Sequence, residues 1–110
     1  MDISFDDQNL EKYANNDRTG QKKLGTKRFQ KFKQRLDQLR ASTTLEDVRH
    51  QPGRFHELTG DRKGQWACDL DHPYRLIFEP QEKPIPTNQD GQYLWIKIKA
   101  VEIVEIKDYH

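Results

Sequence analysis

The sequence predicts an α+β fold in which one antiparallel sheet carries its helices on a single face. Residues 55–80 contain three short segments of alternating polarity, residues 22–41 carry a helical apolar stripe, and residues 93–109 predict a long final strand of alternating polarity. With a short strand expected at 2–5, the order is a strand, two helices and a four-stranded meander. A chain of 110 residues can bury one core, so we expect one domain over 1–110.

The centre of the predicted sheet lies between two turn sequences, GDRKG at 60–64 and DLDHP at 69–73. Between them Trp66, Cys68 and Leu70 alternate with residues that face the other way, which indicates a strand with one buried face. The segment YRLIFE after the second turn alternates in the same manner. These strands are expected to carry the rest of the fold.

Residues 22–41 give the strongest helix signal, because apolar side chains recur every three or four residues: Phe29, Phe32, Leu36 and Leu39. Basic residues lie largely off this stripe: Lys27, Arg28, Lys31, Lys33 and Arg35. The chain has a net charge of +1, but residues 17–40 hold nine Lys or Arg against two Asp, a local balance of +7. Such a helix is either a solvated surface or a binding face for a polyanion.

The remaining elements are shorter. Asp6 or Asp7 is expected to cap a first helix, and Thr43 or Thr44 a later helical turn. The polar residues 15–20 predict a loop, as do the three prolines within residues 80–92. The alternation in the last predicted strand, 93–109, shifts near residue 100, which predicts a bulge there.

Several classes of protein are excluded by composition. The single cysteine, Cys68, allows no internal disulfide, fits a reducing cytoplasm and is expected in the core rather than as a nucleophile. No apolar segment approaches the roughly 20 residues of a membrane span, and the acidic N-terminus lacks the pattern of a signal peptide. The four histidines share no metal-ligand spacing, so we expect no metal and no cofactor.

One rim of the predicted sheet gathers the residues that can carry chemistry. Successive strands of a meander reverse direction, which brings the starts of two strands beside the end of the last one. This rim holds Arg54, His56, Arg75, Asp108, Tyr109 and His110. Histidine can transfer protons, arginine can hold a phosphate and tyrosine can stack on a base. A structural histidine and a frayed polar tail fit the same residues, and Arg62 and Lys63 fall on the opposite rim.

Four motifs together are characteristic of a known family: FHEL at 55–58, GDRKGQW at 60–66, YRLIF at 74–78 and DYH at 108–110. With them the chain resembles the HigB-type toxins of the RelE/ParE superfamily, also called plasmid-maintenance killer proteins, over nearly its whole length. The resemblance implies a small twisted, mainly antiparallel sheet with an N-terminal strand and two to three helices packed on one face.

The resemblance also implies a function. Such toxins of type II toxin-antitoxin systems enter the ribosomal A site, beside 16S rRNA, and cleave translated mRNA. In the implied reaction, which needs no metal, the ribose 2′-OH attacks the adjacent phosphate and leaves a 2′,3′-cyclic phosphate and a 5′-OH. The implied partner is a HigA-like antitoxin with a helix-turn-helix domain, through which alone the toxin would meet operator DNA. No membrane partner is expected.

By position, the resemblance assigns the active site to His56, Arg75, Asp108, Tyr109 and His110. One of the two histidines would act as base or acid, the aspartate would orient a histidine, the arginine would stabilise charge and the tyrosine would position the RNA. Candidate RNA contacts are Arg54, Lys27, Arg28, Lys31, Arg62 and Lys63. Thr59 departs from the family pattern, which often has a lysine at this phosphate-contacting position.

Two other functions fit the same sequence. The superfamily fold also hosts ParE-like toxins, which bind DNA gyrase and cut nothing. A non-catalytic RNA-binding module built on the basic helix is the other alternative. The rim cluster distinguishes these classes, because a protein that only binds has no need of His56 together with Asp108-Tyr109-His110.

Overall fold

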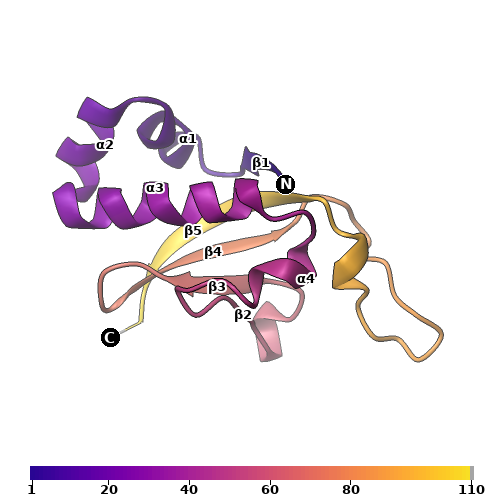
Figure 1. Cartoon of the computed structure of the whole chain (residues 1–110). Coiled ribbons are helices and arrows are strands. Elements are labelled where there is room, and N and C mark those ends of the chain that lie inside the picture. The colour runs from indigo at the N-terminus through magenta and orange to yellow at the C-terminus, as the bar shows by residue number, and fades with distance from the viewer. Residues whose placement is uncertain (110) are drawn as a thin grey trace.

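The computed structural model describes residues 1–109 and has the predicted order of strand, helices and meander (Figure 1). The strands are β1 (Asp2–Phe5), β2 (His56–Glu57), β3 (Trp66–Asp69), β4 (Tyr74–Pro80) and β5 (Ala100–Asp108). The α-helices are α1 (Gln8–Asn15), α2 (Asp17–Leu24), α3 (Thr26–Ala41) and α4 (Leu45–Val48). Two 3₁₀ helices are η1 (Gly60–Arg62) and η2 (Trp95–Lys97).

The sheet has the order β1-β5-β4-β3-β2, in which β1 runs parallel to β5 and every other neighbouring pair is antiparallel. This confirms the predicted α+β class and the four-stranded meander. The helices α1, α2 and α3 lie on one side of the sheet, with α3 running along it (Figure 1). The opposite side, which we call the outer face, carries none of these three helices, and the short helix η1 lies below β2 in this view.

The core lies between α3 and the sheet. Phe32, Leu36 and Leu39 of α3 are fully buried against inward-facing residues such as Trp66 and Phe78. Full burial of side chains of this kind contributes about 1.5–3 kcal/mol each. The predicted apolar stripe is therefore confirmed.

Arg35 corrects the helix prediction. The sequence placed this residue off the apolar stripe, but its exposed fraction is only 6%. Its guanidinium donates to the carbonyl of Asp69, at the end of β3, at 2.7 Å and to the side chain of Gln38, on α3 itself, at 2.9 Å. A buried cation is tolerated when hydrogen bonds replace its hydration.

The helical region also begins earlier than predicted and has a break. Residues 15–20, expected to be a loop, lie largely in α2, where the Asn16 side chain accepts from the N–H of Thr19 at 3.0 Å and so caps the helix. Gly25, with φ +83°, then separates α2 from α3. The predicted caps are confirmed, since Asp7 caps α1 and Thr44 caps α4.

The last strand is shorter than predicted. Residues 93–99 do not pair as a strand; Trp95 and Ile98 are buried three residues apart, which is a helical spacing, and the chain between them forms η2. β5 begins at residue 100, and its register against β4 shifts by one residue at Val104 instead of near residue 100. The strand therefore keeps apolar side chains on its inner face on both sides of this irregularity.

Candidate active site

A cavity of about 90 Å³ opens at the end of the sheet where β3 passes into β4. Its lining combines two arginines with one acid, one imidazole and two phenols: Arg54, Asp69, Leu70, His72, Pro73, Tyr74, Arg75 and Tyr109. The lining comes from the segment before β2, from the β3–β4 turn and from the residue after β5. The rim predicted from strand direction therefore brings Arg54, Arg75 and Tyr109 together.

Asp69 is the centre of charge in this cavity. Its carboxylate lies 3.5 Å from Nη1 of Arg54 and 3.6 Å from Nε of Arg75, its cross-strand partner. Because each guanidinium carries five N–H donors, one carboxylate contact leaves donors for a phosphate. The Arg75 guanidinium also lies 4.5 Å from the ring centroid of Tyr109, a cation–π contact that places the phenol beside the cation.

Arg54 is presented by a strained turn. Its φ is +54°, and it is the one residue other than glycine within 1–109 with positive φ. The preceding Gly53 has φ +113°, and its carbonyl accepts from the N–H of Asp69 at 2.8 Å. The Arg35 guanidinium packs against Gly53, since a Cβ built there would lie 2.6 Å from Cζ. Strained backbone of this kind is often found where a side chain must point at a ligand.

The β3–β4 turn is fixed from the other side by α3. Arg28 donates to both carboxylate oxygens of Asp71, at 3.0 and 3.2 Å, and its guanidinium lies 3.5 Å from the ring centroid of Tyr74. The N–H of Tyr109 donates to the carbonyl of Pro73 at 3.0 Å. Arg28, a predicted RNA contact, is thus held in an internal ion pair with 24% of its side chain exposed.

His56 lies on the same outer face but not among the residues that line the cavity. It pairs with Ala67, two residues from Asp69 along β3, and β3 lies between it and the strand of Arg75. Its Nδ1 is 2.7 Å from the carbonyl oxygen of Arg54. Because a carbonyl only accepts, Nδ1 donates, and Nε2 of the neutral ring carries the lone pair.

The predicted C-terminal residues divide between the two faces. Asp108 pairs with Tyr74 and so faces the helix side, whereas Lys107 pairs with Arg75 on the outer face. Tyr109 turns back to the cavity with Arg75. His110 lies outside the described residues.

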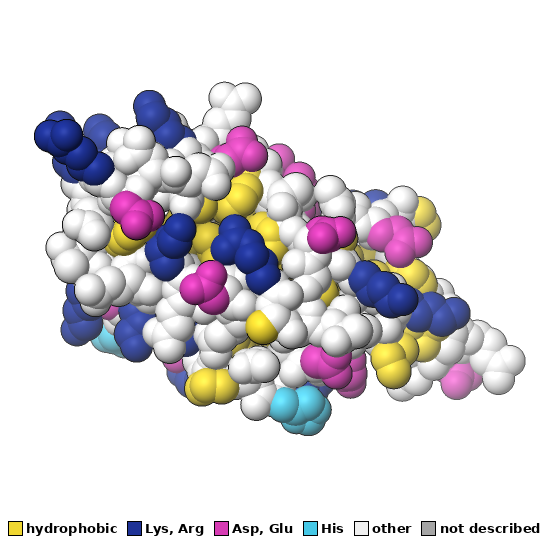
Figure 2. Space-filling view, turned by 45° about the horizontal axis from the view of Figure 1, so that its top comes forward, with side chains coloured by type: hydrophobic (Ala, Val, Ile, Leu, Met, Phe, Trp, Pro, Cys, Tyr) yellow, Lys and Arg dark blue, Asp and Glu magenta, His cyan; other side chains and the backbone are white. Residues whose placement is uncertain are grey.

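The remaining basic residues lie elsewhere. Arg62, predicted on the opposite rim, reaches across the outer face and bonds to Glu105 at 3.0 Å and to Gln65 at 2.8 Å. Lys63 lies 5.6 Å from the ring centroid of Tyr93. Lys27 is exposed on α3 and Lys31 is half-buried. Figure 2 shows Lys and Arg side chains gathered at the end of the molecule that α2 forms.

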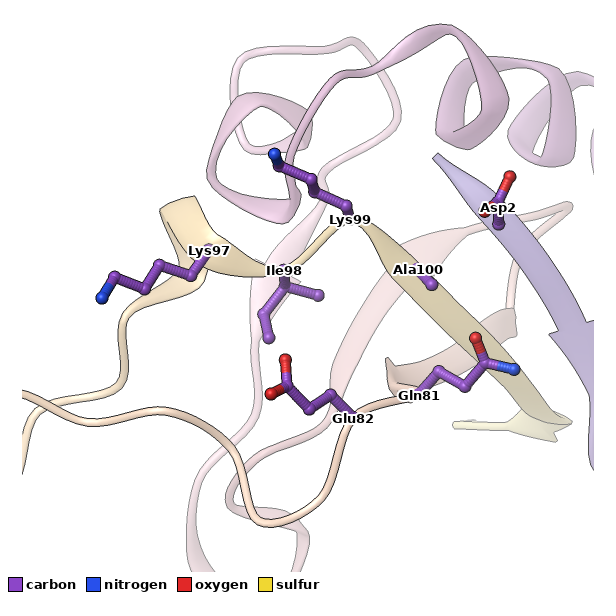
Figure 3. A pocket seen from close by; sticks show the side chains of 7 residues that line it. All are labelled: Asp2, Gln81, Glu82, Lys97, Ile98, Lys99 and Ala100. Atoms are coloured by element: carbon purple, nitrogen blue, oxygen red, sulfur yellow. The ribbon is translucent and has the colours of Figure 1, made fainter.

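Two further cavities hold little of the predicted site. One of about 320 Å³ lies at the start of β5, where Glu82 and Ile98 face each other and Lys97 points away (Figure 3). Another, of about 740 Å³, is an open groove between Lys63 and the segment 88–95. The cavity around Asp69 is therefore the candidate site.

Sequence reasoning missed Asp69 and His72. The signal was present, because Asp69 precedes the turn and falls opposite Arg75 once the hairpin is in register. His72 stands in the same DLDHP sequence, for which the sequence pattern predicts only a turn.

Cys68 is fully buried, and burial raises the pKa of its thiol far above the usual range. That is the environment of a core cysteine and not of a nucleophile. Within residues 1–109 no three His, Cys, Asp or Glu side chains are grouped as metal ligands require. The helices of the described chain are all too short or too polar to cross a membrane.

Comparisons with known proteins agree with the fold. The chain resembles the YoeB-YefM complex from Staphylococcus aureus, with 15% identity, a TM-score of 0.59 and coverage of 100% of this chain and 98% of the other. It also resembles a YoeB/ParE toxin from Agrobacterium tumefaciens, with 10% identity, a TM-score of 0.55 and full coverage of both chains. At these identities the likeness concerns the fold alone.

The family is shown by sequence. No curated protein matches the chain significantly. A family model described as the RelE-like toxin of type II toxin-antitoxin system HigB matches residues 3–105. The chain therefore belongs to the HigB-like toxins of the RelE/ParE superfamily, as its motifs predicted.

Proposed function

We propose that this toxin is a ribosome-dependent mRNA endonuclease that acts in the cytoplasm and inhibits translation. The observation that carries the proposal is the cavity in which Arg54, Arg75 and Tyr109 meet around Asp69. Two guanidiniums and a phenol on an open sheet face suit a phosphate with an unpaired base beside it. A protein that only bound a partner would not require this arrangement.

The proposed reaction is a transesterification within the RNA. The 2′-oxygen forms a bond to phosphorus, the bond to the 5′-oxygen breaks, and the products are a 2′,3′-cyclic phosphate and a 5′-OH. Arg75 stabilises the charge that develops on the phosphate, so its contribution is largest in the transition state. Arg54 holds the phosphate, and Tyr109 stacks on a base.

Proton transfer in this proposal follows the family resemblance. His56 or His110 exchanges protons with the 2′-OH and the 5′-oxygen, and Asp108 orients a histidine. His56 has the suitable tautomer, because Nδ1 donates to a carbonyl and Nε2 is left to accept. Protein side chains supply every proton transfer, so the proposed chemistry needs no metal ion at the active site.

The proposed partners are the ribosome, mRNA and an antitoxin. The exposed Lys27, with Lys31 and Lys63, would contact 16S rRNA at the A site. The YoeB toxin of Staphylococcus aureus was solved with YefM, and we propose a HigA-like antitoxin with a helix-turn-helix domain for this chain. Operator DNA would be contacted only through that antitoxin.

Induction of the toxin in cells, followed by mapping of mRNA 5′ ends, tests the proposal. We expect new ends inside translated frames. Arg75→Ala should lower cleavage on purified ribosomes by about 10²–10³-fold, as loss of a donor to a developing oxyanion does, and should weaken ribosome binding much less. Lys99→Ala, at the far end of the sheet, is the matched control and should cleave normally. Intact mRNA with stalled DNA gyrase would instead establish the ParE-like activity.

A further inference from the structure

His72 lies on the wall of the candidate site and has no role in the mechanism above. It shares the cavity with Arg54, Arg75 and Tyr109, whereas His56 lies outside that lining. We propose that His72 is a catalytic residue, the general base that accepts the proton of the ribose 2′-OH. This inference rests on the proposed function, because it names the base for the same cleavage reaction, in place of His56 or His110 at that one step.

The turn that carries His72 is held in place by contacts on both sides. The N–H of Leu70 donates to the carbonyl of Tyr74 at 3.0 Å, and the N–H of Tyr74 donates to the carbonyl of Asp71 at 2.8 Å. The bidentate bond from Arg28 ties Asp71, the residue before His72, to α3. Pro73, the residue after it, accepts from the main chain of Tyr109. The backbone of His72 is therefore fixed relative to Arg75 and Tyr109.

The His72 side chain is exposed, so it is accessible to an RNA that enters the cavity. The charged or titratable groups that line the cavity with it come from each element of the site: Arg54 before β2, Asp69 at the end of β3, Tyr74 and Arg75 on β4, and Tyr109 after β5. Asp71 precedes His72 in the turn. Asp69 and Asp71 are each paired with arginine. Among the side-chain types that line the cavity, only histidine ordinarily titrates between pH 5 and 8.

This placement completes a set of groups for one phosphate. Arg54 and Arg75 hold the phosphate, and the imidazole on the same wall accepts the proton as the 2′-oxygen attacks phosphorus. The bond from phosphorus to the 5′-oxygen then breaks, and that oxygen takes a proton from a second histidine, His56 or His110.

The test uses single-turnover cleavage of mRNA on programmed ribosomes between pH 5.5 and 8.5. His72→Gln should lower the rate by about 10²–10⁴-fold, the usual contribution of a proton-transfer group. It should also remove the fall in rate that we expect of the parental toxin as the pH is lowered and the base takes up a proton. Ribosome affinity and thermal unfolding should not change, and added imidazole should restore part of the activity of His72→Ala.

The matched control is His50→Gln, an exposed histidine just after α4 and away from the cavity. It should cleave at the parental rate with the parental pH profile. A folded His72→Gln that cleaves like the parental toxin, while the parental toxin does cut, would overturn this inference and leave the proposed function standing. A parental toxin that cuts no mRNA on any ribosome would overturn the proposed function, and this inference with it.

Discussion

The buried guanidinium of Arg35 donates a hydrogen bond of 2.7 Å to the main-chain carbonyl of Asp69. The same guanidinium packs against Gly53, whose carbonyl accepts from the N–H of Asp69. A residue of the helix layer thus supports both segments that carry the acid and Arg54 into the site. The positive φ of Arg54 is retained because the contact between Arg35 and Gly53, inside the core, holds this turn in one conformation.

Gly53→Ala should therefore be unusually destabilising. The new Cβ would combine positive φ with a contact of 2.6 Å to Cζ of Arg35, and we expect the free energy of unfolding to fall by about 2–5 kcal/mol. Gly91→Ala is the control, because its φ is +80° but nothing lies within 4 Å of its Cβ position. It should cost only the ~1–2 kcal/mol of the left-handed conformation. Urea unfolding measures both, and equal losses would show that Arg35 moves aside freely.

Gly20→Ala distinguishes helix propensity from packing. Alanine in a helix is favoured over glycine by about 1 kcal/mol, which alone would predict stabilisation. In the structure a Cβ at Gly20 would collide with the ring of Phe29 and lie 2.7 Å from the carbonyl oxygen of Tyr13, and a main-chain atom cannot yield cheaply. We expect a net loss of about 1–3 kcal/mol in chemical denaturation. Gln21→Ala, its exposed neighbour, should stay within about 0.5 kcal/mol of the parent, and a stabilised Gly20→Ala would contradict this packing.

The helices and the sheet show which parts of the fold the sequence can predict and which it cannot. Periodicity identified the inner face of α3 and of the sheet, because buried apolar residues repeat with the period of their element. It misplaced Arg35 because the burial of this side chain depends on the carbonyl of Asp69, which lies far along the chain. It also divided the helical region wrongly, since one cap at Asn16 outweighed the polarity of the residues that follow it.

The candidate site was predicted in part. Strand direction alone brought Arg54, Arg75 and Tyr109 to one rim, since antiparallel pairing fixes which strand ends meet. To place Asp69 beside Arg75, one must know the register of the β3–β4 hairpin, and the turn sequence does not determine that register. Successive side chains of a strand point to opposite faces of the sheet. Asp108, which pairs with Tyr74, therefore faces away from the cavity, although it is adjacent in sequence to Tyr109.

Cys68 should make stability depend on alkaline pH. An unfolded thiol ionises near pH 8.5, whereas burial raises the pKa of Cys68, so the folded state keeps a proton that the unfolded state loses. The free energy of unfolding should then be unaffected by this group below about pH 8.5 and fall by up to ~1.4 kcal/mol per pH unit above it. Cys68→Ala lacks this contribution. The difference in stability between the parent and this variant, measured from pH 7 to 10, should shrink as pH rises; a constant difference would refute the assignment.

The basic helix should contribute to ribosome binding through Lys27, which is exposed, and Lys31, which is half-buried. Lys27→Glu with Lys31→Glu should weaken association and reduce the slope of log K against log salt by about two units, one for each lost phosphate contact. Arg28 is left intact, because reversing it would break its ion pair with Asp71. The control is Lys97→Glu with Lys99→Glu, which makes the same charge change at the other end of the sheet. If the two double variants had equal effects on ribosome binding, the basic face of α3 would be an ordinary solvated surface with no specific part in binding.

Replacement of His110 by glutamine should abolish most cleavage with little change in stability. This residue follows Tyr109, which is 36% exposed, and it lies beyond the apolar part of β5, so we expect a change in unfolding free energy within about 0.5 kcal/mol. A proton-transfer group contributes about 10²–10⁴-fold to rate, and the loss should appear in the chemical step on ribosomes that still bind the toxin.

A double variant then tests whether His110 and Arg75 act on one phosphate. Groups that act together in one transition state give losses smaller than the product of the single effects, because removing either already disables the shared step. His110→Gln combined with Arg75→Ala should therefore cleave little more slowly than the worse single variant. Thermal unfolding of the same preparations separates chemistry from folding. Losses that multiplied in full would show that His110 and Arg75 contribute independently and not to one shared step. A His110→Gln variant that cleaved at the parental rate would show that His110 has no part in the reaction.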